Sequence, residues 1–268
     1  MRLKRLKISE AAKLLEGQEG YLALSYLLDM TLGELRMKKD EELDPNIEKA
    51  YRDLALKRQQ AYPLQYALGF WDFYGRTFRV DPRALIPRPE TELLVEFVLQ
   101  ENLKGKKILD LGTGTGVIAI SLKLEENHAK LFASDLSGAA LSLARENASC
   151  LGADIEFIQS DLFSNLEEKF SIIVSNPPYV GEKERASLAK ELSYEPELAL
   201  FSGADGLDIF WALIQGAYEH LEEGGKVFLE IGSRQGEAVS KMMEKAGFHQ
   251  IEVVKDYTGR NRFVVGLR

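Results

Sequence analysis

Apolar positions in the first part of the chain recur at helical spacing. Between residues 47 and 55 they follow i, i+3, i+4, i+7 and i+8, and Asp44-Pro45 before them is typical of a helix start. A second stripe over residues 23–30 predicts another helix, which we expect Gly33 to end. Since this part shows no strand pattern, residues 1–63 predict a small helical bundle.

Residues 64–86 change character, because they are rich in aromatic and β-branched side chains with turn residues between them. This composition predicts a β-hairpin that turns near Tyr74-Gly75-Arg76 and joins the two parts of the chain.

From residue 87 to 268, helical and strand patterns alternate. Helices are predicted over residues 90–103, 116–124, 139–148, 206–221 and 236–246, and strands over 107–111, 130–134, 154–159, 170–174 and 226–231. Two last strands, 251–255 and 262–267, flank Thr258-Gly259. The alternation predicts an α/β domain with a doubly wound, seven-stranded, mostly parallel sheet and an antiparallel edge.

Composition narrows the function classes. The 268 residues carry 34 Lys and Arg against 42 Asp and Glu, a formal net charge of -8, which disfavours general binding to nucleic acid or anionic membranes. One cysteine excludes a disulfide framework, and three scattered histidines predict no metal site. The sequence has no long apolar run and no secretory signal pattern, so we expect a cytoplasmic protein.

A glycine-rich loop follows the first predicted strand of the sheet. It comprises Gly112, Thr113, Gly114, Thr115 and Gly116. Asp110 before the loop is expected to brace it or to face a ligand's amino group, and Asp135 after the next strand to bind both hydroxyls of a ribose. A carboxylate before a short GxGxG loop suits a positively charged nucleoside such as S-adenosylmethionine. A nicotinamide cofactor and a ligand-free turn are the alternatives.

Two side chains after the third strand are further candidates. Phe163 could lie flat on an adenine ring, and Asp161 could accept a hydrogen bond from its exocyclic amine. The alternatives are a core position for Phe163 and a turn cap for Asp161.

The fourth strand runs into Asn176-Pro177-Pro178-Tyr179. The prolines stiffen the backbone and have no N–H, so the Asn176 side chain and the Pro177 carbonyl are expected to act as acceptors. Two acceptors and the flat ring of Tyr179 suit a planar –NH2 group. A rigid structural turn is the alternative.

The residues from Asp110 to Gly116, together with Asn176–Tyr179, resemble the amino-group methyltransferases that use S-adenosylmethionine. Other segments are similar to the release-factor glutamine methyltransferases in particular. These are Gln65–Gly69, Phe73–Gly75, Ile86–Glu92, Tyr194–Pro196, Gly203–Leu207, Glu230–Gly232 and Asp256–Arg262.

The resemblance implies a class I, Rossmann-like methyltransferase that methylates the amide nitrogen, N5, of glutamine in the Gly-Gly-Gln motif of class I peptide chain release factors. It implies that Gly112–Gly116, Asp135, Phe163 and Asn176 hold the cofactor. It also implies that Asn176–Tyr179 receive the glutamine amide. Residues 180–189 carry no interpretable pattern.

Basic side chains outside the motifs allow two interpretations each. Arg88 either contacts substrate or cofactor or pairs with nearby acids. A basic face of the helical bundle either docks the release factor, as the resemblance supports, or is a solvated surface. It comprises Arg2, Lys4, Arg5, Lys7, Arg36, Lys38 and Lys39. We expect a monomer.

Two other functions compete with this interpretation. A nucleic-acid methyltransferase acting on adenine N6 or guanine N2 would use the same turn, but residues 90–268 contain no basic run to clamp phosphates. A non-catalytic binding module would not need the intact Asn176–Tyr179 turn.

Overall fold

The computed structural model describes residues 5–268, and they form two compact units. The first, helical unit extends to Phe70 and also includes Lys190–Tyr194. The second, α/β unit comprises Trp71–Ala189 and Glu195–Arg268.

The helical unit is built from short helices around a small apolar core. They are α1 (Ile8–Ala11), η1 (Ala12–Leu14), α2 (Glu19–Leu28), α3 (Leu32–Met37), α4 (Pro45–Gln59) and α5 (Leu64–Leu68). Leu24, Leu35 and Tyr51 are fully buried between them. Asp44 caps α4 by accepting from the backbone N–H of Asn46 at 2.9 Å, as the sequence predicts.

Two expectations for this unit are wrong. Helix α2 ends at Leu28 because Asp29 adopts a left-handed conformation, φ 51°, and Gly33 lies inside α3. Residues 64–68 form helix α5 instead of part of the hairpin, because Leu64 packs into the helical core and Gly69 ends the turn with φ 83°. Of the expected basic face, Arg2 and Lys4 lie outside the described residues.

A two-stranded hairpin follows, formed by β1 (Phe70–Phe73) and β2 (Arg76–Arg79). Tyr74 and Gly75 both have positive φ, 49° and 70°, which is the geometry of a tight two-residue hairpin turn. The predicted position of the turn is therefore confirmed.

The α/β unit contains the seven-stranded sheet that the sequence predicts. Its strands are β3 (Lys107–Leu111), β4 (Lys130–Asp135), β5 (Glu156–Gln159), β6 (Phe170–Ser175), β7 (Leu221–Glu230), β8 (His249–Lys255) and β9 (Asn261–Leu267). Their order is β5-β4-β3-β6-β7-β9-β8. The first five are parallel, and β9 runs antiparallel to β7 and β8.

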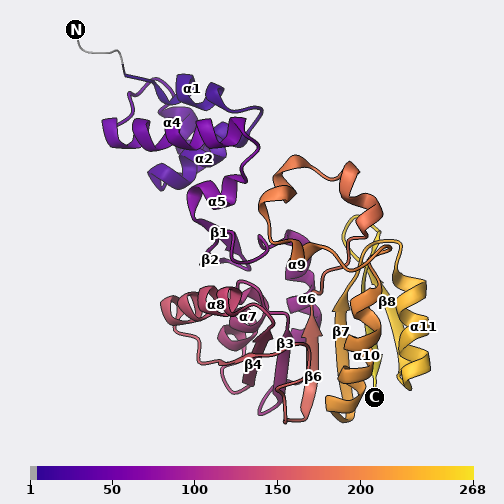
Figure 1. The fold of residues 1–268 in the computed structure, drawn as a ribbon. Coiled ribbons are helices and arrows are strands. Elements are labelled where there is room, and N and C mark those ends of the chain that lie inside the picture. Colours follow the sequence, from indigo (N-terminus) through magenta and orange to yellow (C-terminus); the bar gives the residue numbers. More distant parts are fainter. Residues whose placement is uncertain (1–4) are drawn as a thin grey trace. The chain divides into compact units, whose positions relative to one another are not determined.

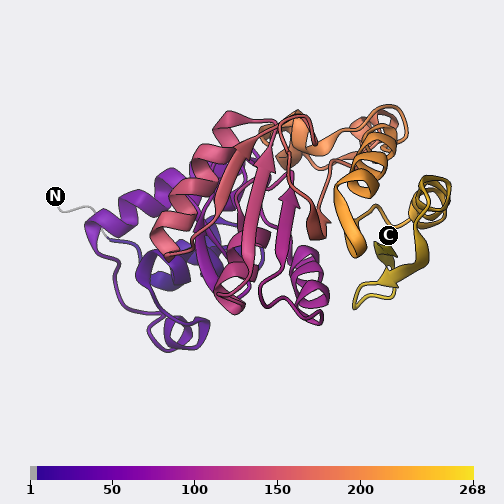
Figure 2. The ribbon, with the colours of Figure 1, turned by 90° about the horizontal axis from the view of Figure 1, so that it is seen from below.

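Helices cover both faces of this sheet (Figures 1 and 2). On one face, α6 (Pro89–Leu99) and α7 (Val117–Glu125) pack in one apolar cluster with α8 (Gly138–Leu151). On the other, α10 (Asp208–His220) and α11 (Gly236–Ala246) form a second cluster. Among residues 5–268, no helix is long and apolar enough to cross a membrane.

The strand order reverses between β3 and β6. From β3 the chain moves outward through β4 and β5, and then returns to pair β6 with the opposite edge of β3. Loops after two such strands diverge and leave a crevice at the carboxyl ends of the strands. The glycine loop follows β3 and the Asn-Pro-Pro-Tyr turn follows β6, so the topology places both at this crevice.

Candidate active site

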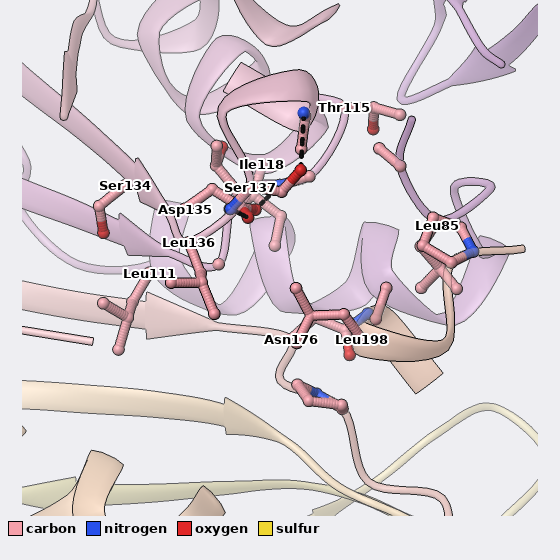
Figure 3. A pocket seen from close by; sticks show the side chains of 18 of the residues that line it. Leu85, Leu111, Thr115, Ile118, Ser134, Asp135, Leu136, Ser137, Asn176 and Leu198 are labelled. Atoms are coloured by element: carbon pink, nitrogen blue, oxygen red, sulfur yellow. Dashed lines mark hydrogen bonds between the residues drawn. The ribbon is translucent and has the colours of Figure 1, made fainter. Parts of the chain in front are cut away.

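A cavity of about 190 Å³ opens at this crevice, and all of its lining residues belong to the α/β unit. Asp135 and Ser137 lie toward one end of the cavity, and Asn176 and Leu198 toward the other (Figure 3). Most of the remaining lining is apolar, with Ile86, Leu111 and Ile118 among it. The cavity therefore brings the glycine loop and the proline turn to one site.

Backbone hydrogen bonds fix the glycine loop. The N–H groups of Gly112 and Thr113 both donate to the Ser134 carbonyl, at 2.8 and 2.9 Å. Gly116 begins helix α7 with φ 85°, and a Cβ atom there would lie 2.9 Å from Ile120. Only glycine fits this position, because the helix approaches closely in a left-handed backbone conformation. Gly116 itself does not line the cavity, whereas residues 112–115 do.

Asp135 connects the end of β4 to the glycine loop. One carboxylate oxygen accepts from the Gly114 N–H at 2.9 Å, and the other accepts from the Ser137 N–H at 2.8 Å. Burial raises the pKa of this carboxyl, while the backbone donors lower it. A carboxylate offers about four lone-pair positions, so both oxygens retain capacity for ligand hydroxyls.

Asp110 braces the loop and does not line the cavity. It is fully buried and accepts from the Thr113 hydroxyl at 2.6 Å and from the Ala119 N–H at 3.1 Å. Burial raises its pKa to about 7. Of the two roles expected for Asp110, the structure shows the structural one.

The structure separates the two candidates after β5. Asp161 lines the cavity, but Phe163 does not. The Phe163 ring is buried against α10, where it stacks on His220 with 4.7 Å between ring centroids and covers Gly216. Leu162, with φ 47°, points to the cavity in its place. Phe163 is thus a core residue here, which corrects the cofactor contact expected of it.

The Asn-Pro-Pro-Tyr turn presents only part of itself to the cavity. Asn176 and Pro178 line it, whereas Pro177 and Tyr179 do not. The Tyr179 hydroxyl donates to Glu230 at 3.2 Å, and its ring packs against the cluster under α10 and α11. The expected ring surface for a substrate amide is therefore turned toward the core in this structure.

Two side chains next to the turn, Thr91 and Glu230, hold Asn176 in a chain of hydrogen bonds. Its amide nitrogen donates to the Thr91 hydroxyl at 3.1 Å, and Thr91 donates to Glu230 at 2.7 Å. Glu230 is fully buried, and burial raises its pKa to about 7.

The backbone beyond the turn is clamped by a second set of contacts. Gln235 donates to the carbonyls of Tyr179 and Gly206, at 3.0 and 3.1 Å. A Cβ on Gly206 would lie 2.1 Å from the Tyr179 carbonyl oxygen, and its φ is 74°. Val180 forms a bridge with Phe201. The stretch that the sequence left without a pattern folds as η2 (Glu182–Ser187), followed by η3 (Lys190–Tyr194) and α9 (Glu197–Leu200).

Arg88 lines the cavity and is also paired. Its guanidinium donates to Glu195 at 2.6 Å, and the other oxygen of Glu195 accepts from the Ile86 N–H at 3.0 Å. The Glu195 side chain is only 2% exposed, so this buried carboxylate fixes the segment from Ile86 to Arg88, which forms part of the cavity wall. The structural pairing expected for Arg88 is present, in a position that also reaches the cavity.

Sequence reasoning missed several residues that shape this site. Thr91, Glu195, Glu230 and Gln235 each hold a cavity residue or the turn by a hydrogen bond, and Leu162 lines the cavity. Thr91, Glu195 and Glu230 lie in segments that carry the family resemblance, which was the only available signal for them.

The cavity residues fit S-adenosylmethionine. Besides Asp135 and the glycine loop, the Ser134 hydroxyl lies at the cavity, buried and without a hydrogen-bond partner among the described residues. A buried unpartnered hydroxyl beside a ribose-type carboxylate indicates a polar ligand. Within residues 5–268, no group of three His, Cys, Asp or Glu side chains could hold a metal ion.

Comparison with known proteins places the chain in a family. The PrmC N-terminal domain model matches residues 7–69, and the methyltransferase small domain model matches residues 89–205. The release factor glutamine methyltransferase of Neisseria gonorrhoeae is 40% identical over 251 residues, 92% of each chain. This chain belongs to the release factor glutamine methyltransferase family. The Streptococcus pneumoniae member is 42% identical over 84% of this chain and 80% of its own.

Solved structures with low identity support the fold. A methyltransferase from Pyrococcus furiosus has a TM-score of 0.59 and 21% identity, covering 79% of this chain and 98% of its own. The E. cuniculi Mtq2–Trm112 complex, responsible for methylation of the eRF1 translation termination factor, has a TM-score of 0.51 and 21% identity over 69% of this chain and 99% of that chain. The expected methyltransferase fold, with its Rossmann-like sheet, is confirmed.

Proposed function

We infer that this protein is an S-adenosylmethionine-dependent methyltransferase that transfers a methyl group to the side-chain amide nitrogen, N5, of a glutamine in class I peptide chain release factors. The target is the glutamine of the Gly-Gly-Gln motif, as the sequence resemblance implies. One observation carries the proposal: Asn176 of the proline turn lines the same cavity as Asp135 and the glycine loop.

The cofactor end of the site consists of residues 112–115, Ser134, Asp135 and Asp161, and these would hold S-adenosylmethionine. When bound, the cofactor supplies an activated methyl group on a sulfonium. The protein's task is then to place the acceptor nitrogen in line with it, at about 3–3.5 Å.

The turn end would hold the glutamine amide. An amide nitrogen is a weak nucleophile, because its lone pair is delocalised into the carbonyl. The Asn176 oxygen would bind one amide hydrogen and favour the positive charge that develops on nitrogen during attack. The Pro177 carbonyl is the proposed second acceptor, although Pro177 does not line the cavity in this structure. The methylated nitrogen is acidic and loses its proton afterwards, so the site needs no strong base.

The helical unit is proposed to dock the release factor, which would give residues 1–63 a role that the catalytic turn alone does not supply. Its substrate would place the enzyme in the cytoplasm, as a monomer without bound nucleic acid. Light scattering of the purified chain, alone and with a release factor, measures this stoichiometry.

The test is mass spectrometry of a release factor after incubation with the protein and S-adenosylmethionine. We expect the Gly-Gly-Gln peptide to gain the mass of one methyl group, and a release factor in which that glutamine is replaced by glutamate to gain none. Methyl transfer to duplex DNA or ribosomal RNA instead would favour the nucleic-acid alternative.

A further inference from the structure

The buried hydrogen bonds behind Asn176 form a continuous network. They connect four side chains from three elements: Asn176 and Tyr179 on the turn after β6, Thr91 in α6 and Glu230 at the end of β7. Thr91 is 2% exposed and Glu230 is fully buried. Thr91 and Asn176 line the cavity, whereas Glu230 and Tyr179 lie behind its wall.

The donors in this network can be assigned from chemistry. Ionised Glu230 only accepts, so the Thr91 hydroxyl must donate its single hydrogen to it. Thr91 can then only accept from Asn176, which must present its amide NH2 group. The Asn176 oxygen is consequently on the other branch of the amide, away from Thr91.

We propose that Thr91 and Glu230 are positioning residues that hold the Asn176 amide in one orientation, with its oxygen available to the cavity as an acceptor. This proposal rests on the proposed function, because an acceptor oxygen at the cavity affects the rate only if the target is an amide NH2 group. Glu230 does not line the cavity, and the hydroxyl of Thr91, which does, is engaged by Glu230 and Asn176. We therefore expect both residues to affect methyl transfer through the Asn176 amide.

The same chemistry defines the wrong orientation. If Glu230 carries a proton, it can donate to Thr91, and Thr91 can then donate to the oxygen of Asn176. The Asn176 amide would be turned over, presenting hydrogens to the cavity where acceptors are needed. Burial and Glu90 favour this protonated form, whereas Arg262, Tyr179 and Thr91 itself favour the ionised form.

The first experiment replaces Thr91 with a residue of the same shape. Thr91→Val removes the hydroxyl, and Thr91→Ser retains it. We expect T91V to lower kcat about tenfold, as loss of one orienting hydrogen bond implies, with KM for S-adenosylmethionine unchanged. T91S should keep wild-type kcat. The matched control is Ser171→Ala on β6, which removes a 2.7 Å hydrogen bond to Glu222 of β7, outside the cavity.

A second variant permits the wrong orientation without changing pH. The amide of Glu230→Gln can donate to Thr91, as a protonated Glu230 would. We expect wild-type kcat to rise as pH passes through about 7, because Glu230 ionises there. E230Q should lack this rise and should lose as much kcat as T91V. Equal kcat losses in T91V and S171A, or the same rise of kcat with pH in E230Q as in wild type, would overturn the proposal.

A spectroscopic readout separates this proposal from the proposed function. In ¹⁵N-labelled protein, the Asn176 side-chain amide signal is identified by its loss in Asn176→Ala. We expect it to shift in T91V and E230Q and to stay in place in T91S and S171A. Unchanged signals in T91V would refute the positioning role. The spectrum needs no methyl transfer, so it remains decisive even if the release factor proves not to be the substrate.

Discussion

At each end of the cavity, a buried carboxylate accepts a hydrogen bond from a threonine hydroxyl, but the two pairs differ in their separation along the sequence. At the cofactor end, buried Asp110 accepts from the hydroxyl of Thr113, three residues away, at 2.6 Å. At the turn end, buried Glu230 accepts from the hydroxyl of Thr91 at 2.7 Å, across 139 residues. In both places a buried carboxylate and a threonine fix a short loop.

This difference in sequence separation changes what each end depends on. The glycine loop is held by its own neighbours and by the end of β4, so it forms wherever β3 and β4 pair. The proline turn depends on α6, β7 and the loop at Gly206, which must all be in place before Asn176 is oriented. The cofactor end is a local structure, and the turn end is a product of the whole α/β unit.

The largest expected effect concerns an aromatic residue beside the cofactor end. Phe163→Ala should lower the free energy of unfolding by about 3–5 kcal/mol, because it empties a buried site between Gly216 and His220. Affinity for S-adenosylmethionine should stay close to wild type. Denaturant titration and calorimetry measure the two quantities. Loss of affinity without loss of stability would show that Phe163 contacts the cofactor after all. Leu162→Ala is the matched variant, because Leu162 lines the cavity.

Asn176→Ala tests the turn end. We expect a fall in turnover of about 10²–10³, the usual cost of losing one positioned charge-stabilising group, with the fold intact. Asn176→Asp should retain more activity than N176A, because it keeps an acceptor. Single-turnover methyl transfer to a release factor decides the matter, and equal rates for wild type and N176A would make the turn purely structural.

Asp135→Ala tests the cofactor end. Because backbone N–H groups of Gly114 and Ser137 already orient its oxygens, we expect loss of about 1.5–3 kcal/mol in binding of S-adenosylmethionine. Calorimetry measures this loss. Asp161→Ala, at an exposed carboxylate lining the same cavity, should cost less. An equal loss in both variants would mean that the backbone-fixed orientation of Asp135 adds nothing to the free energy of cofactor binding.

A last expected effect is a pH dependence of stability. The pKa of Asp110 is raised from 3.8 to about 7 in the fold, so the folded state binds its proton more tightly than the unfolded chain. The resulting stability is complete below about pH 4 and lost as pH rises through about 7. The difference in unfolding free energy between wild type and Asp110→Asn should therefore fall across this range in urea titrations. A difference that stays constant with pH would argue against the raised pKa.

Features that depend on neighbouring residues could be predicted from the sequence, whereas features that depend on distant residues could not. Strand β3 and helix α11 occur at the predicted residues, because both are defined by their own periodicity and end signals. Residues 112–115 and Asp135 line one cavity, as the motif spacing predicts, whereas Gly116 does not, and binding of the cofactor there stays a prediction. Helix α5 was missed, because its burial against the helical core outweighs the strand-like composition around it.

The sequence misassigned Phe163 because it does not show which way a side chain points after a strand. Phe163 and Leu162 are adjacent, and the left-handed backbone of Leu162 decides which of them faces the cavity. The sequence around Asn176 also does not predict its hydrogen-bonded connection to Thr91 and Glu230. Contacts across 85 and 139 residues form only when the sheet is assembled.

Residues 190–194 belong to the helical unit, although the chain on both sides of them belongs to the α/β unit. Arg58 pairs with Glu191 at 2.8 Å, and the Tyr194 hydroxyl donates to the Gln60 carbonyl at 3.0 Å. The chain thus passes between its two units three times. A chimaera that exchanged only residues 5–70 with those of a relative would leave Glu191 and Tyr194 with partners from another sequence. The portable module is therefore discontinuous, and recombination between relatives preserves it only when both segments are inherited together.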